Sequence, residues 1–428
     1  MSSESKSLSI EQSILWNSIG SMVYLVCNWL TTVLVVVFGS DLSMSGSLAV
    51  AMSVGNIFAT IVLFRARTVQ VSEMHRNLSS GNFIGHRVLT IVIATFFCFV
   101  YSIFSVAPSD WAVVSCYCLF KAVDSSVDVL HGIDQINSRL DYAAISQILR
   151  GVGLLVGFIV GLVFFKSLLV AVLLMAIVSL AVVFIYDFPV TSRLCSIAPV
   201  FEKDSLILLF KVCFPGFIAS LACTSVVSLT RQFYGLSYGN QQLGIYAAVA
   251  TPTAVVQALV TYLYAPLLGP LAKGWQEGRI KDIVRLIRKV LLAVAVATFA
   301  CVIGALVLGE PVLTLIYGQT VGAHSSYLSL MLVATAFTGL MFFSIDLSIS
   351  FGKPSYGFIS SAVALLSAVL LSSRLFSLQE FATDANIISV VVICAYGIGL
   401  SLLAVLIMRL IEDNVSIGKD NSNRESDQ

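Results

Sequence analysis

One segment of the sequence combines ionisable side chains with a helical period. Its polar residues recur at alternating intervals of three and four: Lys121, Asp124, Asp128, His131 and Gln135. At about 100° per residue, they fall within an arc of roughly 80° on one helix face. A charge at the centre of a membrane helix costs about 2.5–3.5 kcal/mol on insertion scales, so this face must meet water or other helices. The stripe predicts a site for a proton, a cation or a charged substrate, or else a neutralised pair that only ties helices together.

Within the stripe, Lys121 and Asp124 can neutralise each other, which leaves Asp128 as the better candidate for proton or sodium coupling. Arg231 lies near the end of another apolar run, where it can hold a phosphate or carboxylate bidentately or snorkel to headgroups. Asp346 is a lone carboxylate in a third run, suited to ion coupling or to a structural hydrogen bond. Lys121 and Arg231 are the predicted substrate-binding cations. The three carboxylates are the predicted ion-coupling groups.

The composition requires a membrane. Of 428 residues, 58% are hydrophobic and only 11% are charged, whereas a soluble domain carries about 25% charged residues, so a soluble enzyme is excluded. The net charge of +1 provides no basic face for nucleic acid. The nine cysteines lack metal-ligand spacing, and no Walker A, HExxH or GxSxG motif is present. We therefore expect no enzyme, no metal site and no cofactor.

Twelve apolar runs are long enough to cross a bilayer and do not alternate as barrel strands do, so they predict helices. They lie at 14–38, 47–64, 88–106, 112–133, 151–165, 167–186, 212–234, 242–268, 290–309, 325–350, 356–373 and 386–408. Most Lys and Arg residues fall in alternate connections, which predicts that the N- and C-termini are both cytoplasmic.

The basic connections are assigned to the inner side of the membrane. Arg65, Arg67 and Arg87 are placed in the loop after the second helix, Arg150 in the loop after the fourth, and Lys273 in the loop after the eighth. These residues enforce the topology. Arg65, Arg67 and Lys273 could also attract anionic lipid headgroups at the inner mouth of a cavity.

The longest polar interruption divides the chain into two pseudo-symmetric halves. The predicted parts are an N-terminal six-helix lobe over 1–187, a cytoplasmic linker over 188–211, a C-terminal six-helix lobe over 212–409, and a polar, disordered cytoplasmic tail over 410–428. Internal repeats of this kind are common in secondary transporters, whose substrate path lies at the interface of the repeats.

The first two helices of each half carry polar stripes at helical spacing. These stripes predict a central polar cavity, although Ser, Thr and Asn side chains also form hydrogen bonds that hold membrane helices together. The fifth and sixth runs, at 151–165 and 167–186, are nearly all apolar and are expected further out. The predicted cavity residues are Asn17, Tyr24, Asn28, Asn56, Thr224, Ser228, Tyr246 and Gln257.

Several segments carry a likeness to a known group. They are RARTVQVSE from Arg65, QINSRLDYAAISQILR over 135–150, Arg231 followed by LGIYA over 243–247, and GEPVLTLIYG over 309–318. With the twelve-helix pattern, they make the chain resemble the polysaccharide (O-antigen-type, Wzx-like) flippases of the MOP superfamily, which also contains the MATE exporters.

The resemblance implies an all-α, MATE-like fold in the bacterial inner (cytoplasmic) membrane. It implies a flippase for polyprenyl-pyrophosphate-linked oligosaccharide, as used in O-antigen and lipopolysaccharide biosynthesis, that works by alternating access coupled to H⁺ or Na⁺. Lys121 and Arg231 would then meet the pyrophosphate, and the polar stripes would meet sugar hydroxyls. Expected partners are the lipid-linked glycan, membrane lipids, a polysaccharide polymerase and glycosyltransferases, with no nucleic acid.

The main alternative is a MATE-like, cation-coupled multidrug exporter. An acidic cavity favours cationic drugs and a cationic cavity favours pyrophosphate, but the counted residues do not decide between them, because two cations oppose three carboxylates. A major-facilitator carrier is a third possibility, and the loop over 65–87 lacks its usual Gly-x-x-x-Asp-Arg pattern. A membrane-bound glycan polymerase would need a large outer loop, which the chain lacks.

Overall fold

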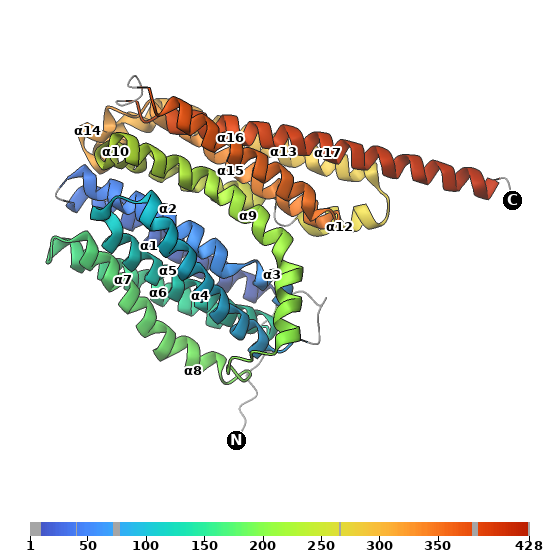
Figure 1. Cartoon of the computed structure of the whole chain (residues 1–428), viewed down its shortest axis with the longest axis horizontal. Helices are drawn as coiled ribbons and strands as arrows, with labels where there is room; N and C mark the ends of the chain where they lie inside the picture. The colour runs from blue at the N-terminus through green and yellow to red at the C-terminus, as the bar shows by residue number, and fades with distance from the viewer. Residues whose placement is uncertain (1–9, 40, 72–77, 265–266, 379–383, 427–428) are drawn as a thin grey trace. The chain divides into compact units, whose positions relative to one another are not determined.

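The computed structural model describes residues 10–39, 41–71, 78–264, 267–378 and 384–426 (Figure 1). The regular elements in these ranges are helices, and no strand occurs among them. Ten helices in this part of the chain are long and apolar enough to cross a membrane. The structure confirms the expected all-α polytopic membrane protein.

The elements follow one another with short connections. The first eight helices are α1 (Ile10–Phe38), α2 (Leu42–Leu63), α3 (Ala66–Val71), α4 (Ser80–Ser105), α5 (Trp111–Ile136), α6 (Leu140–Val163), α7 (Leu168–Val182) and α8 (Phe188–Thr191). The remaining helices are α9 (Lys203–Tyr238), α10 (Asn240–Ala250), α11 (Ala254–Tyr264), α12 (Leu268–Gln276), α13 (Ile280–Tyr317), α14 (Gln319–Gly322), α15 (Tyr327–Ser350), α16 (Pro354–Leu375) and α17 (Ile387–Ser426).

The twelve apolar runs all fall on helices. Two of the runs lie on helices that are not among the ten candidate membrane spans. Helix α5 carries Lys121 and three aspartates, and the α10–α11 pair is interrupted by a 3₁₀ turn at Thr251–Thr253. Several helices begin a few turns before their apolar runs. As a result Arg87 lies inside α4 and Arg150 inside α6, so their assignment to loops was wrong.

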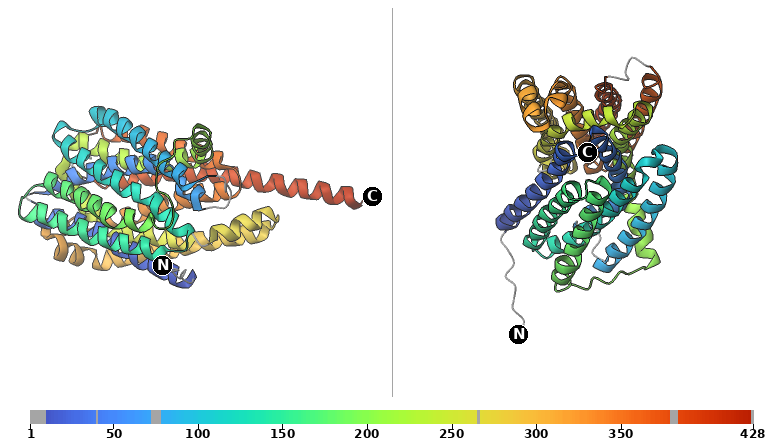
Figure 2. Two further views of the ribbon diagram at one scale, coloured as in Figure 1. Left: turned by 90° about the horizontal axis from the view of Figure 1, so that it is seen from below. Right: turned by 90° about the vertical axis from the view of Figure 1, so that its left-hand side faces the viewer.

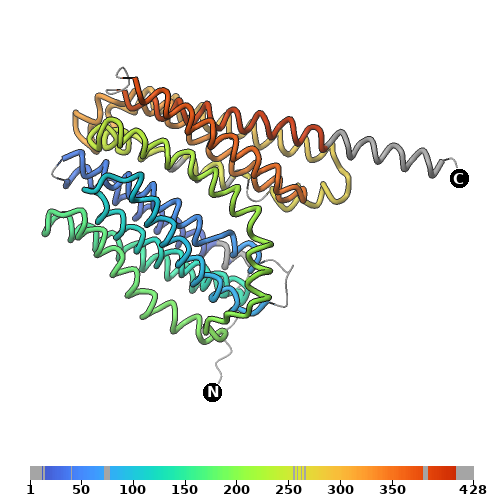
Figure 3. Tube along the Cα trace, in the orientation of Figure 1, coloured from blue at the N-terminus to red at the C-terminus, as the bar shows by residue number. Residues whose placement is uncertain are grey.

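The chain forms two compact units. The first consists of Met1–Phe217 and Arg231–Thr251, and the second consists of Ile218–Thr230 and Pro252–Gln428. Helix α9 contributes to both, and its trace is continuous in Figure 3. Pro215 lies within α9 next to the boundary, where it removes one backbone hydrogen bond of the helix.

The segment 188–211, expected to be a linker, packs on the first unit. The Val200 N–H donates to the carbonyl of Gly81, at 2.9 Å. Leu209 is fully buried in a cluster with Phe83 and Ile133, and Ile197 packs against the same cluster. The boundary of the first compact unit therefore falls at Phe217, after this segment.

Parts of the predictions lie outside the described residues. These include the first nine residues, Glu73 of the loop before α4, and the side chains from residue 411 onward. The cytoplasmic placement of both termini stays a prediction. Helix α17 continues to Ser426, so the structure places residues 410–426 in a helix, whereas the sequence predicted disorder over 410–428.

Small residues allow the helices of the first unit to lie close together. Helix α1 packs on α6 and α6 on α7, side by side in Figures 1 and 2. A Cβ on Gly20 would lie 2.6 Å from the Cα of Ala144, and one on Gly161 would lie 2.2 Å from the Cα of Ala171. Such contacts are typical of membrane helix pairs, in which packing replaces the hydrophobic effect.

We expect Gly161→Val to destabilise the protein by about 1–3 kcal/mol or more, because the added side chain meets the backbone of α7, which cannot move aside cheaply. The matched control is Gly304→Val in α13, where a Cβ has nothing within 4 Å. The measurement is the Tm of each purified variant in one detergent. Equal Tm values for the two variants would contradict this packing argument.

Candidate functional site

The polar face of α5 carries two carboxylates, and each of them is held by cations. Asp128 accepts from Arg67 Nη1 at 3.0 Å and from Arg87 Nη2 at 2.8 Å. The side chain of Arg87 is 3% exposed and that of Arg67 is 32% exposed. Arg87 also donates to the carbonyl of Val62, at 2.9 Å. Asp128 is therefore ion-paired with two arginines and not left unpaired, as the sequence suggested, and its role in ion coupling stays a prediction.

A strained turn delivers Arg67 to α5. Phe64 and Arg65, between α2 and α3, have φ values of 47° and 55°, a region that non-glycine residues rarely adopt. The turn lays α3 on α5, where Gln70 Nε2 donates to the carbonyl of Val129 at 3.0 Å. Gly132 leaves the space that the Gln70 amide fills.

Asp124 forms the second half of the arrangement. It accepts from Arg150 Nη1 at 2.7 Å and from the hydroxyl of Tyr24, and it lies 3.6 Å from Lys121 Nζ. The Arg150 side chain is 5% exposed. The predicted Lys121–Asp124 pair is thus present, but the shorter ion pair is with Arg150. Helix α6, expected to be peripheral, supplies that arginine.

We call these six residues the charge network: Arg67, Arg87, Lys121, Asp124, Asp128 and Arg150. The network holds four cations and two carboxylates, so its formal charge is positive, at +2. Arg87 and Arg150 are buried, whereas Arg67 and Lys121 stay partly exposed. This arrangement can bind an anion without unpairing its buried members.

Sequence reasoning missed Arg87 and Arg150, although a signal for them existed. Two carboxylates within an apolar bundle need bonded partners, because an unpaired buried charge is very costly. The arginines next to the third and fifth apolar runs were the nearest candidates. Hydropathy alone began those runs one residue too late to include them.

A second group of buried polar residues lies on the same unit. Asp187 Oδ1 is 3.8 Å from His131 Nε2, and the Thr191 hydroxyl donates to Asp134 Oδ1 at 3.1 Å. Asp187 ends a π-helical turn, Val183–Asp187, a local widening often found at functional sites. His131 of the predicted stripe thus lies beside an acid that the sequence did not single out.

Arg231 keeps its charge free of a carboxylate partner among the described residues. Its guanidinium lies 5.7 Å from the ring centroid of Tyr246, and its Nε is buried without a hydrogen-bond partner. The next residue, Gln232, accepts from the Tyr101 hydroxyl at 2.6 Å. The lack of a carboxylate partner and the unpaired Nε both suit the predicted role of Arg231 as an anion-binding cation.

Helix α10 brings Tyr246 to Arg231 by packing on α2. Asn240 Nδ2 donates to Asp110 Oδ2 at 2.8 Å, and the Ser47 hydroxyl donates to Asp110 Oδ1 at 2.7 Å.

Asp41 caps α2. The hydroxyl of Ser43, together with backbone N–H groups, holds the pKa of the Asp41 carboxyl below its usual value.

The predicted polar stripes are divided between the units. The first unit carries Asn17, Tyr24, Asn28, Asn56 and Tyr246, and the second carries Thr224, Ser228 and Gln257. The Tyr24 hydroxyl is committed to Asp124, and Tyr246 and Ser228 are buried. Asn56 and Gln257 are exposed. That these residues line one cavity stays a prediction.

Asp346 lies on α15 in the second unit. The Tyr264 hydroxyl donates to its Oδ2 at 3.2 Å, which agrees with the structural-hydrogen-bond interpretation and leaves ion coupling untested. The described residues include no group of three metal-ligating side chains. Lys273 is exposed and lies 3.9 Å from Glu277, whereas Arg65 is half-buried in the turn before α3.

Asp128→Ala should cost of the order of 3 kcal/mol of stability, because it leaves the buried Arg87 without its carboxylate. Arg67→Ala should cost about 1 kcal/mol or less, because Arg67 is partly exposed and can be hydrated. The Tm of each variant in detergent measures the difference. The double variant Arg87→Met/Asp128→Leu should recover most of the loss, and equal losses for the two single variants would contradict the assignment.

Comparisons with known proteins give similarity in structure only. No model of a known protein family matches the sequence, and the comparison with curated proteins found no match. A multidrug resistance MATE family transporter of the MOP superfamily, in an inward-facing conformation, matches with a TM-score of 0.72 and 11% identity over 94% of this chain and 99% of that chain. An outward-facing structure of such a transporter matches with a TM-score of 0.60 and 11% identity, over 94% and 95%.

A third similar structure is a MOP superfamily transporter from Pyrococcus furiosus, described as having a binding pocket of reverse polarity that suggests a different function. Its TM-score is 0.60, with 11% identity over 94% of this chain and 95% of that chain. At such identities, the similarity extends to the fold. The chain has the fold of the MATE transporters of the MOP superfamily.

Proposed function

We propose that this protein is a flippase of the bacterial inner membrane. It moves a polyprenyl-pyrophosphate-linked oligosaccharide, such as an O-antigen repeat unit, from the cytoplasmic to the outer leaflet by alternating access. The observation that carries the proposal is the positive charge of the network on the first unit. The fold similarity to MATE transporters supports membrane transport as the activity, without a catalytic step.

The network suits a diphosphate for a geometric reason. Arginine presents a planar fork of donors that matches phosphate oxygens bidentately. Arg67 is 32% exposed and Lys121 is 15% exposed, so both can reach a ligand, whereas Arg87 and Arg150 hold the carboxylates in place behind them. Arg231 adds a cation with an unused donor. Exposed amides such as Asn56 and Gln257 are suited to sugar hydroxyls.

Ion coupling follows from competition for the same cations. A phosphate bound to Arg67 weakens the hold of that arginine on Asp128, whose negative charge then favours uptake of H⁺ or Na⁺. In the same way, a phosphate bound to Lys121 weakens the hold of that lysine on Asp124. The coupling is therefore assigned to these two carboxylates rather than to an unpaired acid. A polysaccharide polymerase and glycosyltransferases are the partners that such a substrate requires.

A MATE-like, cation-coupled multidrug exporter is the second candidate, because similar structures are described as multidrug resistance transporters. A cationic drug would be repelled by the positive charge network. The Pyrococcus furiosus transporter, described as having reverse pocket polarity, is a case in which pocket charge is linked to a different function within this fold.

The deciding experiment uses a strain that lacks this protein. Polyprenyl-linked glycans are extracted and identified by mass spectrometry, and a membrane-impermeant, sugar-oxidising reagent reports the leaflet that they occupy. We expect single repeat units to be trapped on the cytoplasmic side and the wild-type chain to release them. Unchanged glycans together with new sensitivity to cationic drugs would favour the exporter.

Lys121→Ala and Arg231→Ala should each reduce translocation by about tenfold or more, since each removes a charge-assisted contact worth about 1.5–3 kcal/mol. Membrane insertion should be unchanged, as shown by the amount of protein in the membrane fraction. Arg374→Ala, at an exposed position at the end of α16, is the matched control. Normal translocation by the Lys121→Ala/Arg231→Ala double variant would exclude the proposed cation role.

A further inference from the structure

A cavity of about 550 Å³ lies in the second unit between α12 and the start of α13, whereas the charge network belongs to the first unit. Four of its lining residues are cations: Lys273, Arg279, Arg285 and Lys289. We call it the basic cavity. Its walls also include two glycines, Gly269 and Gly274, whose lack of side chains leaves the interior open.

The fold holds this cavity in a defined shape. The turn between α12 and α13 contains Gly278 at φ 67°, and the Arg279 N–H donates to the carbonyl of Gly274 at 2.9 Å. Trp275 of α12 stacks on Phe351, with ring centroids 4.5 Å apart. Ile283 of α13 is fully buried against α12. The cations are therefore displayed from two anchored helices.

The charges of the basic cavity are only partly neutralised. Glu277 pairs with Lys273 at 3.9 Å and with Arg279 at 2.5 Å, and Asp282 lies 3.4 Å from Arg285. Lys289 forms no ion pair with any residue that the structure describes. Two carboxylates thus pair with three of the four cations, and the side chains of Lys273 and Arg285 remain 71% and 69% exposed.

The position of Lys289 along α13 places the cavity at the surface of the hydrocarbon core. After Lys289, the sequence carries no charge until Glu310. The twenty residues between them span about 30 Å as a helix, which is the thickness of the hydrocarbon core. Large apolar side chains begin directly after it, with Leu292 63% and Phe299 67% exposed. Lys289 therefore lies at the level of lipid headgroups, next to lipid tails.

We propose that the basic cavity binds the phosphate headgroup of an anionic bilayer phospholipid, whose acyl chains lie along the exposed apolar face of α13. A phospholipid fits better than a free anion because cations and apolar surface adjoin along one helix. Clustered Lys and Arg residues next to a membrane attract anionic lipid headgroups. The site depends only on the chain spanning a membrane, so its test is separate from that of the transported substrate.

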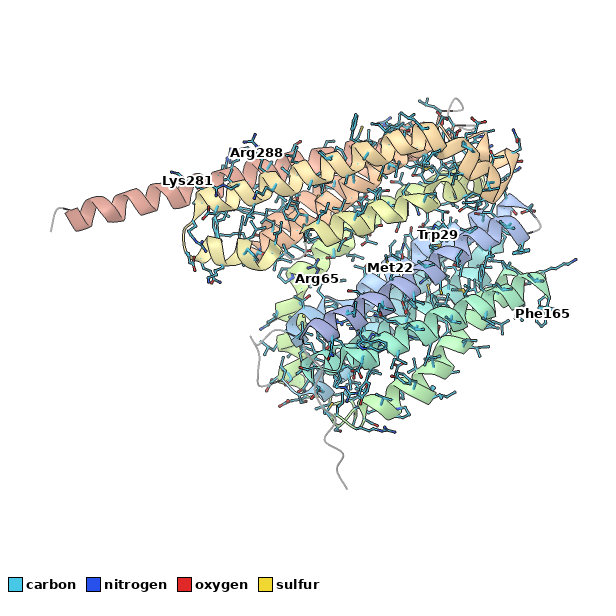
Figure 4. All side chains as sticks on the ribbon, turned by 180° about the vertical axis from the view of Figure 1, so that it is seen from behind. Met22, Trp29, Arg65, Phe165, Lys281 and Arg288 are labelled. Atoms are coloured by element: carbon cyan, nitrogen blue, oxygen red, sulfur yellow. The ribbon has the colours of Figure 1, made fainter. Side chains whose placement is uncertain are left out.

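The chain provides a matched control for this site. Arg285 and Lys289 line the cavity, whereas Lys281 and Arg288 belong to the same stretch of α13 and do not line it. Figure 4 shows Lys281 and Arg288 on the side of α13 away from α12. The variants Arg285→Gln/Lys289→Gln and Lys281→Gln/Arg288→Gln therefore remove equal charge from the same region, and only the first alters the cavity.

The test titrates the purified full-length chain in detergent with phosphatidylglycerol or phosphatidylcholine of identical acyl chains, and native mass spectrometry counts the bound lipid. We expect the wild type to prefer phosphatidylglycerol. The cavity variant should lose about tenfold or more in affinity for it, and the control variant about threefold or less. Equal losses in the two variants, or equal binding of both lipids by the wild type, would overturn the proposal.

Gly269 offers a test that adds charge instead of removing it. A Cβ there has nothing within 4 Å, so Gly269→Asp can introduce a carboxylate at the cavity wall, and Gly269→Asn is its neutral control. Only the Asp variant should lose phosphatidylglycerol. Displacement of that lipid by millimolar inorganic phosphate would overturn the proposal in favour of a free-anion site. Stronger, cavity-dependent binding of geranylgeranyl diphosphate would overturn it in favour of a site for the transported lipid.

Discussion

The ion pair between Arg87 and Asp128 is the constraint on which the first unit depends. Arg87 is 3% exposed, so its charge is tolerable only with a bonded carboxylate. The pair fixes α4 against α5, and the bond from Arg87 to the carbonyl of Val62 adds α2 to the same point. A buried pair of this kind adds little net stability over an apolar core. It specifies instead which helices meet and in what register.

The Arg150–Asp124 pair repeats this logic one turn away on α5. It fixes α6, and Tyr24 adds α1 through its bond to the same carboxylate. Because Asp124 and Asp128 are one helical turn apart, both pairs use one face of one helix. Five helices converge on that face, and the two left-handed residues before α3 are tolerated because they bring Arg67 to it.

The sequence predicted the helices well because apolar runs of bilayer length have few alternative structures. It also identified the α5 stripe, since Lys121, Asp124 and Asp128 share one face by period alone. It misplaced Arg87 and Arg150 because hydropathy averages over a window and counts an arginine as the end of a run, whereas the structure keeps it inside a helix by pairing it. The turn at Phe64 and Arg65 could not be predicted, because neither residue type favours positive φ. Asp187, which lies beside His131, ends a π-helical turn, for which the sequence has no reliable signal.

The exposure of the four cations suggests how one network can serve both folding and transport. Arg87 and Arg150 are almost fully buried, so exchanging their carboxylates for a ligand would expose each acid to the cost of an unpaired buried charge. The side chain of Arg67 is 32% exposed. Its change of partner therefore costs less free energy, because water can solvate it during the exchange. In the proposed mechanism, a ligand phosphate displaces the outer cation from Asp128 while the inner one stays in place. The carboxylate is then held by one arginine instead of two, which favours uptake of a small cation without loss of the helix packing. A network with a single layer of cations could not separate these two tasks.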